Sequence, residues 1–155
     1  MTLPMDIRLA SESAKFGFVF ARRGLVPEAA SSWFLPRIVG IQQALEWVYS
    51  ADILTAEQAL AGRLVRSLHE PDDLVPAAQE LARSFVVNRS PAALGLTKRL
   101  LYRNSAAAEP LEAHLSDSLA MYWQSLGDGK EGVAAFLEKR PPTFTGSARD
   151  LPDVY

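Results

Sequence analysis

A single carboxylate, that of Glu28, has the sequence setting best suited to chemistry in this chain. The stretch FGFVFARRGLVPEAASSWFLPRIVG, residues 16–40, places it after Pro27 and before a pattern typical of a helix. Four aromatic residues lie near it in the sequence: Phe18, Phe20, Trp33 and Phe34. A carboxylate held among such side chains can take up and release protons, so this stretch favours general acid–base catalysis.

Glu28 also has a purely structural interpretation. Proline is typical of the first position of a helix, and a carboxylate near a helix start is stabilised by the free N–H groups and the helix dipole. Acidic residues at helix starts are common and need no ligand to explain them. From the residues alone, both interpretations stay open.

The other reactive residue types exclude several kinds of site. The chain has no cysteine, which removes disulfides, thiolate nucleophiles and cysteine-bearing zinc sites and fits a cytoplasmic location. Its two histidines, His69 and His114, are too scattered to predict a metal site. His114 lies near Ser116, but side chains two residues apart on a helix diverge, so no catalytic triad is expected. No phosphate-binding or dinucleotide-binding glycine motif occurs, so no separate cofactor is expected.

The composition describes an ordinary globular chain. Its 155 residues suit one domain, and 48% hydrophobic with 22% charged residues is typical of a soluble protein. A net charge of -2 gives no general attraction to nucleic acid. The apolar runs are shorter than the roughly 18 residues that a membrane span needs. We therefore expect an intracellular protein without nucleic-acid or membrane partners.

The first half of the chain predicts a few short strands mixed with helices. Residues 5–9, 15–20 and 64–68 predict strands. A helix is expected from about residue 29 to Gly40, with an interruption near Pro36, and a second helix over residues 41–48. Thr55 and Gly62 are typical of the start and the end of a further helix.

The second half predicts helix almost to its end. One helix is expected after residues 71–73, and others begin at Ser90 and Glu109, each followed by proline. A last helix is expected over residues 130–139, followed by a loosely ordered tail. So few strands cannot form an independent sheet with both faces covered. The chain is therefore either mostly helical or half of something larger.

The order of these elements, together with particular words, is similar to a known family. MDIRLAS, AKFGFVFARRGLVPEAASSWFLPRIVG, ALEW, AEQALAGRLV and EGVAAFLEKRPPTF resemble the enoyl-CoA hydratase/isomerase (crotonase) superfamily, over residues 5–144. The resemblance implies an α/β chain corresponding to the C-terminal part of a crotonase-like spiral fold. It divides the sequence into a partial spiral core, residues 1–68, a helical region, 69–145, and a tail, 146–155.

The resemblance covers only the second half of a family domain. The first half carries CoA-binding loops and two backbone N–H groups that hold the thioester oxygen. We therefore expect the sequence to be truncated, or to start at an internal methionine.

The resemblance also bears on the reaction. Hydratases of the family hold a water molecule between two glutamates. One of these would lie upstream of Met1, and the other falls at Phe20, whose ring cannot accept a proton. Several isomerases of the family carry their acid in the word G-[LI]-x-x-[ED], which is GLVPE at residues 24–28 here. The resemblance thus implies a double-bond isomerase that acts on an acyl-CoA, with Glu28 as its proton shuttle.

Further residues are candidates for substrate binding by the same resemblance. Lys139 matches a family lysine near the CoA phosphates, although a lysine at a helix C-terminus needs no ligand. The other candidates are mostly aromatic and are equally compatible with a plain core: Phe18, Phe20, Gly24, Trp33 and Phe136. The family assembles as trimers or hexamers, so a homo-oligomer is expected. Two other functions stay open, namely a non-catalytic fragment or assembly partner, and an unrelated helical binding module.

Overall fold

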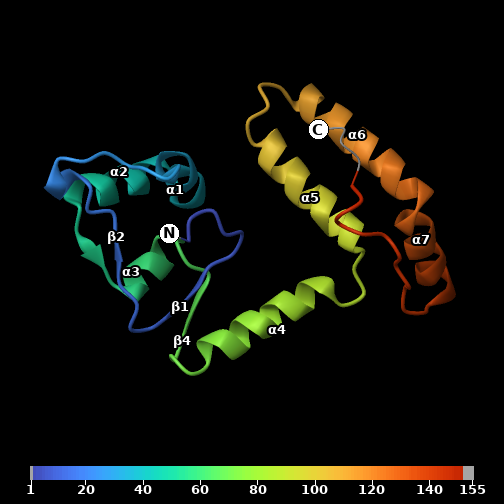
Figure 1. Ribbon diagram of the computed structural model, residues 1–155, viewed down its shortest axis with the longest axis horizontal. Helices are drawn as coiled ribbons and strands as arrows, with labels where there is room; N and C mark the ends of the chain where they lie inside the picture. The colour runs from blue at the N-terminus through green and yellow to red at the C-terminus, as the bar shows by residue number, and fades with distance from the viewer. Residues whose placement is uncertain (1, 152–155) are drawn as a thin grey trace. The chain divides into compact units, whose positions relative to one another are not determined.

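The computed structural model describes residues 2–151 (Figure 1). The chain forms two compact units, Met1–Leu81 and Ala82–Tyr155, which are described separately below. The boundary falls inside a helix, whereas the sequence pattern divided the chain after residue 68 and again after residue 145. The last four residues of the expected tail, 152–155, lie outside the described residues.

Short strands of the first unit pair in two places. β1 (Leu9–Ser11) pairs in parallel with β4 (Ser67–His69), and β2 (Phe16–Gly17) pairs antiparallel with β3 (Ile53–Leu54). The β1–β4 pair joins segments far apart in the sequence, with Ala10 opposite Leu68. These two ladders hold the loops that precede the helices.

Helices make up most of the rest of the first unit. A 3-10 turn, η1 (Ala21–Arg23), is followed by α1 (Ser31–Val39), α2 (Ile41–Ser50) and α3 (Ala56–Ala61). Gly40 alone joins α1 to α2, and its φ of 83° lies in the region that favours glycine. The side chains of Thr55 and Gln58 form a reciprocal capping box at the start of α3, as the sequence pattern predicted.

The core of the first unit is a cluster of buried apolar side chains. Phe18 and Trp47 stack with ring centroids 6.1 Å apart and planes at 7°. The indole of Trp47 lies against Gly62, where an added Cβ would be 2.4 Å from two of its ring carbons. The cluster consists of Ala10, Phe18, Leu35, Ala44, Trp47, Leu54, Ala59, Leu64 and Val65.

The strands are shorter than expected and lie at other positions. The segment predicted as a strand over residues 5–9 is a turn up to residue 7, and pairing begins only at Leu9. The expected strand over residues 15–20 ends at Gly17, because Phe20 already has the helical φ and ψ that start η1. The strand expected over residues 64–68 forms over Ser67–His69 instead. Strand β3 had no clear sequence signal.

The helices agree better with the sequence pattern. α1 starts at Ser31 rather than near residue 29, because Ala29 and Ala30 both have positive φ. It continues through Pro36 without the expected interruption. Pro36 lies in the second turn of α1, and its carbonyl oxygen accepts the hydrogen bond from the N–H of Gly40 that closes the helix.

Helices α5 (Pro91–Asn104), α6 (Pro110–Leu126) and α7 (Asp128–Glu138) form the second unit, and α4 (Leu74–Val86) leads into it. α5 packs on α6, and α6 packs on α7 (Figure 1). The predicted cap of α5 is present, since the hydroxyl of Ser90 accepts a 3.0 Å hydrogen bond from the N–H of Ala93. Among the described residues, no helix is both long enough and apolar enough to cross a membrane.

Many large apolar side chains of the second unit are exposed. The apolar residues that recur at helical spacing along α6 are exposed rather than buried, and so is the apolar face of α7. The exposed residues of these two helices are Leu111, Leu115, Leu119, Met121, Tyr122, Trp123, Leu126, Val133, Phe136 and Leu137.

Candidate active site

Glu28 lies in a strained loop just before α1. The two residues that follow it, Ala29 and Ala30, have φ of 51° and 58°, a left-handed conformation that alanine rarely adopts. The backbone carbonyl of Glu28 accepts two hydrogen bonds from Ser31, one of 3.0 Å from the N–H and one of 2.6 Å from the hydroxyl. Ser31 is buried at the start of the helix. The backbone carbonyl of Glu28 is therefore held in place by Ser31, three residues further along the chain.

This loop contributes Glu28, Ala29 and Ser31 to the wall of a cavity of about 360 Å³. This volume is within the range of about 300–1,000 Å³ typical of small-molecule sites. Glu28 and Lys15 are its charged lining residues, and Phe16, Phe18 and Phe20 contribute aromatic rings. The rest of its wall is formed by Thr2, Leu3, Pro4, Gly17, Ala29, Ser31 and Leu64. The predicted juxtaposition of Glu28 with Phe18 and Phe20 is therefore present.

A second cavity of about 140 Å³ shares three wall residues with the first: Phe18, Phe20 and Ser31. Apart from Ser31 and Ser32, its lining is apolar and comes mainly from α1 and α2. The remaining lining residues are Pro27, Leu35, Pro36, Ile41, Ala44, Leu45 and Val48. The two cavities together present a charged compartment beside an apolar one.

The carboxylate of Glu28 is not engaged in an ion pair with any residue from 2 to 151. It is solvent-exposed at the cavity wall. A carboxylate in this position is free to exchange protons with a molecule inside the cavity.

Two other candidates of the first unit do not line either cavity. Gly24 is exposed at the end of η1, with a φ of 66° that explains the choice of glycine. Trp33 packs edge-on against Phe34 with centroids 4.7 Å apart, and the guanidinium of Arg37 lies 4.1 Å from the centre of its ring. The aromatic wall beside Glu28 therefore comes from residues 16–20 and not from the helix that follows.

The remaining two candidates, Phe136 and Lys139, belong to the second unit. Phe136 is 81% exposed near the end of α7. Lys139 is exposed just after this helix in a left-handed conformation, with φ of 56°. Its backbone N–H donates a 3.3 Å hydrogen bond to the carbonyl of Phe136.

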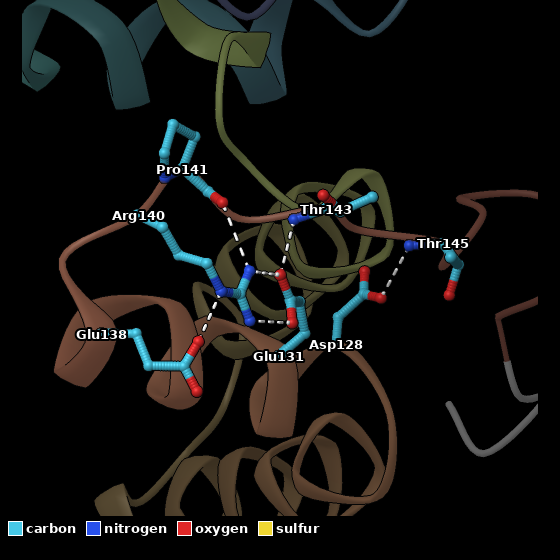
Figure 2. A network of polar contacts seen from close by, with 7 residues as sticks. All are labelled: Asp128, Glu131, Glu138, Arg140, Pro141, Thr143 and Thr145. Atoms are coloured by element: carbon cyan, nitrogen blue, oxygen red, sulfur yellow. Dashed lines mark hydrogen bonds and ion pairs between the residues drawn. The ribbon is translucent and has the colours of Figure 1, made fainter.

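A polar network holds the segment after α7 (Figure 2). Arg140 contacts both carboxylate oxygens of Glu131 at 2.6 and 2.9 Å and one oxygen of Glu138 at 2.6 Å. The N–H of Thr143 donates a 2.7 Å hydrogen bond to Glu131. The hydrogen bonds from Arg140 and Thr143 lower the pKa of Glu131 to about 2 and outweigh its desolvation.

Asp128, at the start of α7, is a buried carboxylate in the same region. One carboxylate oxygen accepts a 2.6 Å hydrogen bond from the Ser90 hydroxyl, and the other accepts bonds of 3.1 and 3.0 Å from the N–H groups of Thr145 and Gly146. Burial opposes the charged form, yet these hydrogen bonds together lower the pKa of Asp128. Residues 143–146, which the sequence pattern assigned to the end of the helical region and the start of a loose tail, are thus tied to α5 and α7.

The sequence pattern missed several residues that form the cavity. Lys15 carries the second charge of the larger cavity, and the turn of residues 2–4 forms part of its wall. Ser31 contacts both cavities and binds the Glu28 carbonyl. Only Ser31 had a usable signal, since serine is favoured at helix starts. Within residues 2–151, no group of acidic or histidine side chains is arranged to hold a metal ion.

Comparisons with known proteins identify the family of the chain. The family model for enoyl-CoA hydratase/isomerase matches residues 1–147. Enoyl-CoA hydratase AFT3-1 of Alternaria alternata is 42% identical over 97% of this chain and 51% of its own length. The 1,2-epoxyphenylacetyl-CoA isomerase of Escherichia coli strain K12 is 36% identical over 94% of this chain and 55% of its own length.

The fold has close counterparts among solved structures. A probable enoyl-CoA hydratase/isomerase from Mycobacterium abscessus superposes with a TM-score of 0.85 and 28% identity, over 94% of this chain and 59% of that one. The expected fold, a few short strands followed by a mainly helical region of crotonase type, is therefore confirmed. The chain spans about half the length of the curated relatives it matches. From the family match and these relatives, we conclude that the chain belongs to the enoyl-CoA hydratase/isomerase family.

Proposed function

We propose that this chain contributes the proton-transferring part of an acyl-CoA double-bond isomerase, with Glu28 as the proton shuttle. The observation that carries the proposal is the place of Glu28, in the wall of a 360 Å³ cavity shared with Phe18 and Phe20. The carboxylate and the aromatic rings suit a substrate that combines an acidic C–H group with an apolar chain.

The proposed reaction moves one proton between two carbons. The Glu28 carboxylate takes a proton from the carbon next to the thioester carbonyl of a 3-enoyl-CoA, and the electron pair spreads over a dienolate. The protonated Glu28 then returns a proton to the far end of that system, which leaves a 2-enoyl-CoA. The enolate oxygen needs preorganised donors, which in this proposal come from polypeptide outside these 155 residues.

The residues favour isomerisation over hydration. Hydration by the family's glutamate pair would need an acid where this chain has Phe20. Phe20 instead lines both cavities with its ring. The relatives include both hydratases and an isomerase, so their names support the family but do not distinguish the two reactions. The preference for isomerisation therefore rests on the residues of this chain.

The decisive variant is Glu28→Gln, with Glu28→Asp as its matched control. Loss of a general acid–base is expected to lower turnover by about 10²–10⁴-fold, with little change in substrate affinity. Double-bond migration in a 3-enoyl-CoA is followed for the 155-residue chain and for the chain joined to the N-terminal half of the E. coli relative. Turnover that survives Glu28→Gln in an active form would refute the shuttle.

An assembly partner without catalysis is the second candidate, and the exposed apolar side chains support it. Met121 is 70% exposed, Leu115 62% and Phe136 81%, and such surface is usually covered by protein. We propose that the helical unit mediates self-association into trimers or hexamers in either case. Light scattering coupled to size exclusion tests the assembly, and acyl-CoA binding separates the two candidates, since only the enzyme requires it.

A further inference from the structure

The side chain of Arg8 binds two backbone segments that border the cavity, the turn of residues 2–5 and the segment at Leu64. Its Nε donates a 2.8 Å hydrogen bond to the carbonyl of Leu64, which lies 56 positions away in the sequence. Its Nη1 donates a bond of 2.6 Å to the carbonyl of Met5 and a longer one of 3.3 Å to that of Leu3. Leu3 and Leu64 both line the 360 Å³ cavity that contains Glu28.

The turn of residues 2–5 has few other attachments. Within it, the N–H of Met5 donates a 3.1 Å hydrogen bond to the carbonyl of Thr2. Thr2, Pro4 and Met5 are exposed, whereas Leu3 is partly buried and packs against the core of the first unit. Thr2 and Pro4 nevertheless form part of the cavity wall, as Leu3 does. The Arg8 guanidinium and the packing of Leu3 therefore hold the wall there together.

Arginine is well suited to this task. Its planar guanidinium presents five N–H donors in a fixed arrangement and has no acceptor, so it can bind several carbonyl oxygens at once. The backbone of Arg8 is itself anchored, because its carbonyl accepts a 2.7 Å hydrogen bond from the N–H of Arg66, next to strand β4. The side chain therefore connects the turn of residues 2–5 to a backbone position that is fixed beside the β1–β4 ladder.

We propose that Arg8 is a positioning residue that holds the wall of residues 2–5 in place for an acyl-CoA in the cavity, an inference that rests on the proposed function. Arg8 does not line the cavity itself. It acts through the backbone that it binds. Its loss is expected to weaken binding, whereas loss of Glu28 impairs proton transfer in a substrate that still binds.

The test compares Arg8→Met with Arg8→Lys and, as a control, Arg23→Met. Arg23 is exposed in the short 3-10 turn η1 and, like Arg8, does not line the cavity. Two measurements are made on each variant, both as the 155-residue chain and joined to the N-terminal half of the E. coli relative. Hydrogen exchange of the amides of residues 2–5 reports the wall, and calorimetric titration with crotonyl-CoA reports affinity. The amides of β1 and β4 show whether the fold is retained.

For Arg8→Met, we expect faster exchange at residues 2–5, unchanged exchange at β1 and β4, and about tenfold weaker binding, which corresponds to about 1.4 kcal/mol. Arg8→Lys is expected to lie between this variant and the wild type, and Arg23→Met to match the wild type. Unchanged exchange at residues 2–5 in Arg8→Lys and Arg8→Met would overturn the proposal. Faster exchange with unchanged affinity would also overturn it.

The design separates this inference from the function on which it rests. If the unaltered chain binds crotonyl-CoA neither alone nor when joined to the N-terminal half of the E. coli relative, the proposed function fails, and the binding role of Arg8 fails with it. The exchange measurement still decides whether Arg8 fixes the turn. If the unaltered chain binds crotonyl-CoA and the Arg8 variants match it in both exchange and affinity, the positioning role is refuted and the proposed function is not.

Discussion

The hydroxyl group of Ser31 donates a 2.6 Å hydrogen bond to the backbone carbonyl oxygen of Glu28. The N–H of Ser31 binds the same oxygen at 3.0 Å, so one residue closes the loop twice. Between the two residues, the chain takes a left-handed path through Ala29 and Ala30. The position of the proposed proton shuttle is thus determined by the residue that begins α1.

Ser31→Ala removes one of these two bonds. We expect a loss of about 1 kcal/mol in unfolding free energy, typical of one hydrogen bond, and lower turnover at similar substrate affinity because Glu28 becomes less well oriented. Denaturant unfolding and steady-state kinetics measure the two effects. Ser125→Ala is the matched control, because its hydroxyl makes the equivalent bond of 2.7 Å to the carbonyl of Tyr122. A loss of turnover in both variants would contradict the specific role of Ser31.

Ala30→Gly is expected to stabilise the first unit. A left-handed alanine costs about 1–2 kcal/mol, and glycine loses about 0.5–1 kcal/mol through its greater freedom in the unfolded chain. The expected net gain is about 0.5–1 kcal/mol. Ala82→Gly, at an exposed position in the interior of α4, should instead destabilise the protein by a similar amount. Thermal unfolding of both variants checks the signs, and a lower midpoint for Ala30→Gly would show that the loop is not strained.

Acid is expected to destabilise the segment after α7. Because the pKa of Glu131 falls to about 2 in the folded chain from an ordinary 4.5, the unfolded state binds the proton more tightly. The stability contributed by Glu131 is therefore fully present above its unfolded pKa and is lost as the pH falls through its folded value. Amide exchange or chemical shifts of Thr143, recorded from neutral pH downwards, follow the release of its hydrogen bond.

Glu131→Gln provides the control for this pH dependence. Glutamine cannot form the charged pair with Arg140, so the variant should be less stable at neutral pH and should lose the part of the acid response that Glu131 causes. Asp128, whose pKa is also lowered, should retain its own response in that variant. An unchanged acid response in Glu131→Gln would assign the effect to Asp128 alone.

Lys139→Ala tests the proposed contact with the CoA phosphates. An exposed ion pair is worth about 0.2–1 kcal/mol, so the dissociation constant for acyl-CoA should rise by about 1.4- to fivefold, and the difference should shrink at high salt. Lys130→Ala is the control, since Lys130 is exposed on α7 at some distance along the helix. Titration at two salt concentrations makes the comparison. Equal effects of the two variants would leave no specific role for Lys139.

The predictions from the sequence were most accurate where structure depends on local contacts. Thr55 and Ser90 start helices because their side chains bind backbone N–H groups three residues on, an interaction that the local sequence specifies. The juxtaposition of Glu28 with Phe18 and Phe20 also followed from neighbouring residues and from a word shared with a family.

Features that depend on distant contacts could not be predicted. Strand β1 exists because Ala10 pairs with Leu68, and its position is determined by this pairing rather than by the residues of the strand. The wall formed by residues 2–4 involves the bonds from Arg8 to the carbonyls of Leu3 and Leu64, two residues far apart in the sequence. The left-handed path of Ala29 and Ala30 had no signal either, because alanine normally favours a right-handed helix.

The close approach of Trp47 to Gly62 has a consequence for how this protein can vary. Any larger residue at position 62 must push the indole aside, and the indole stacks on Phe18, which lines both cavities. A change at a residue that carries no charge and lines neither cavity would therefore alter the shape of the cavities in which we propose that an acyl chain binds. We therefore expect the residue at position 62 to vary together with the size of the substrate, although Gly62 is far from Glu28 in the sequence.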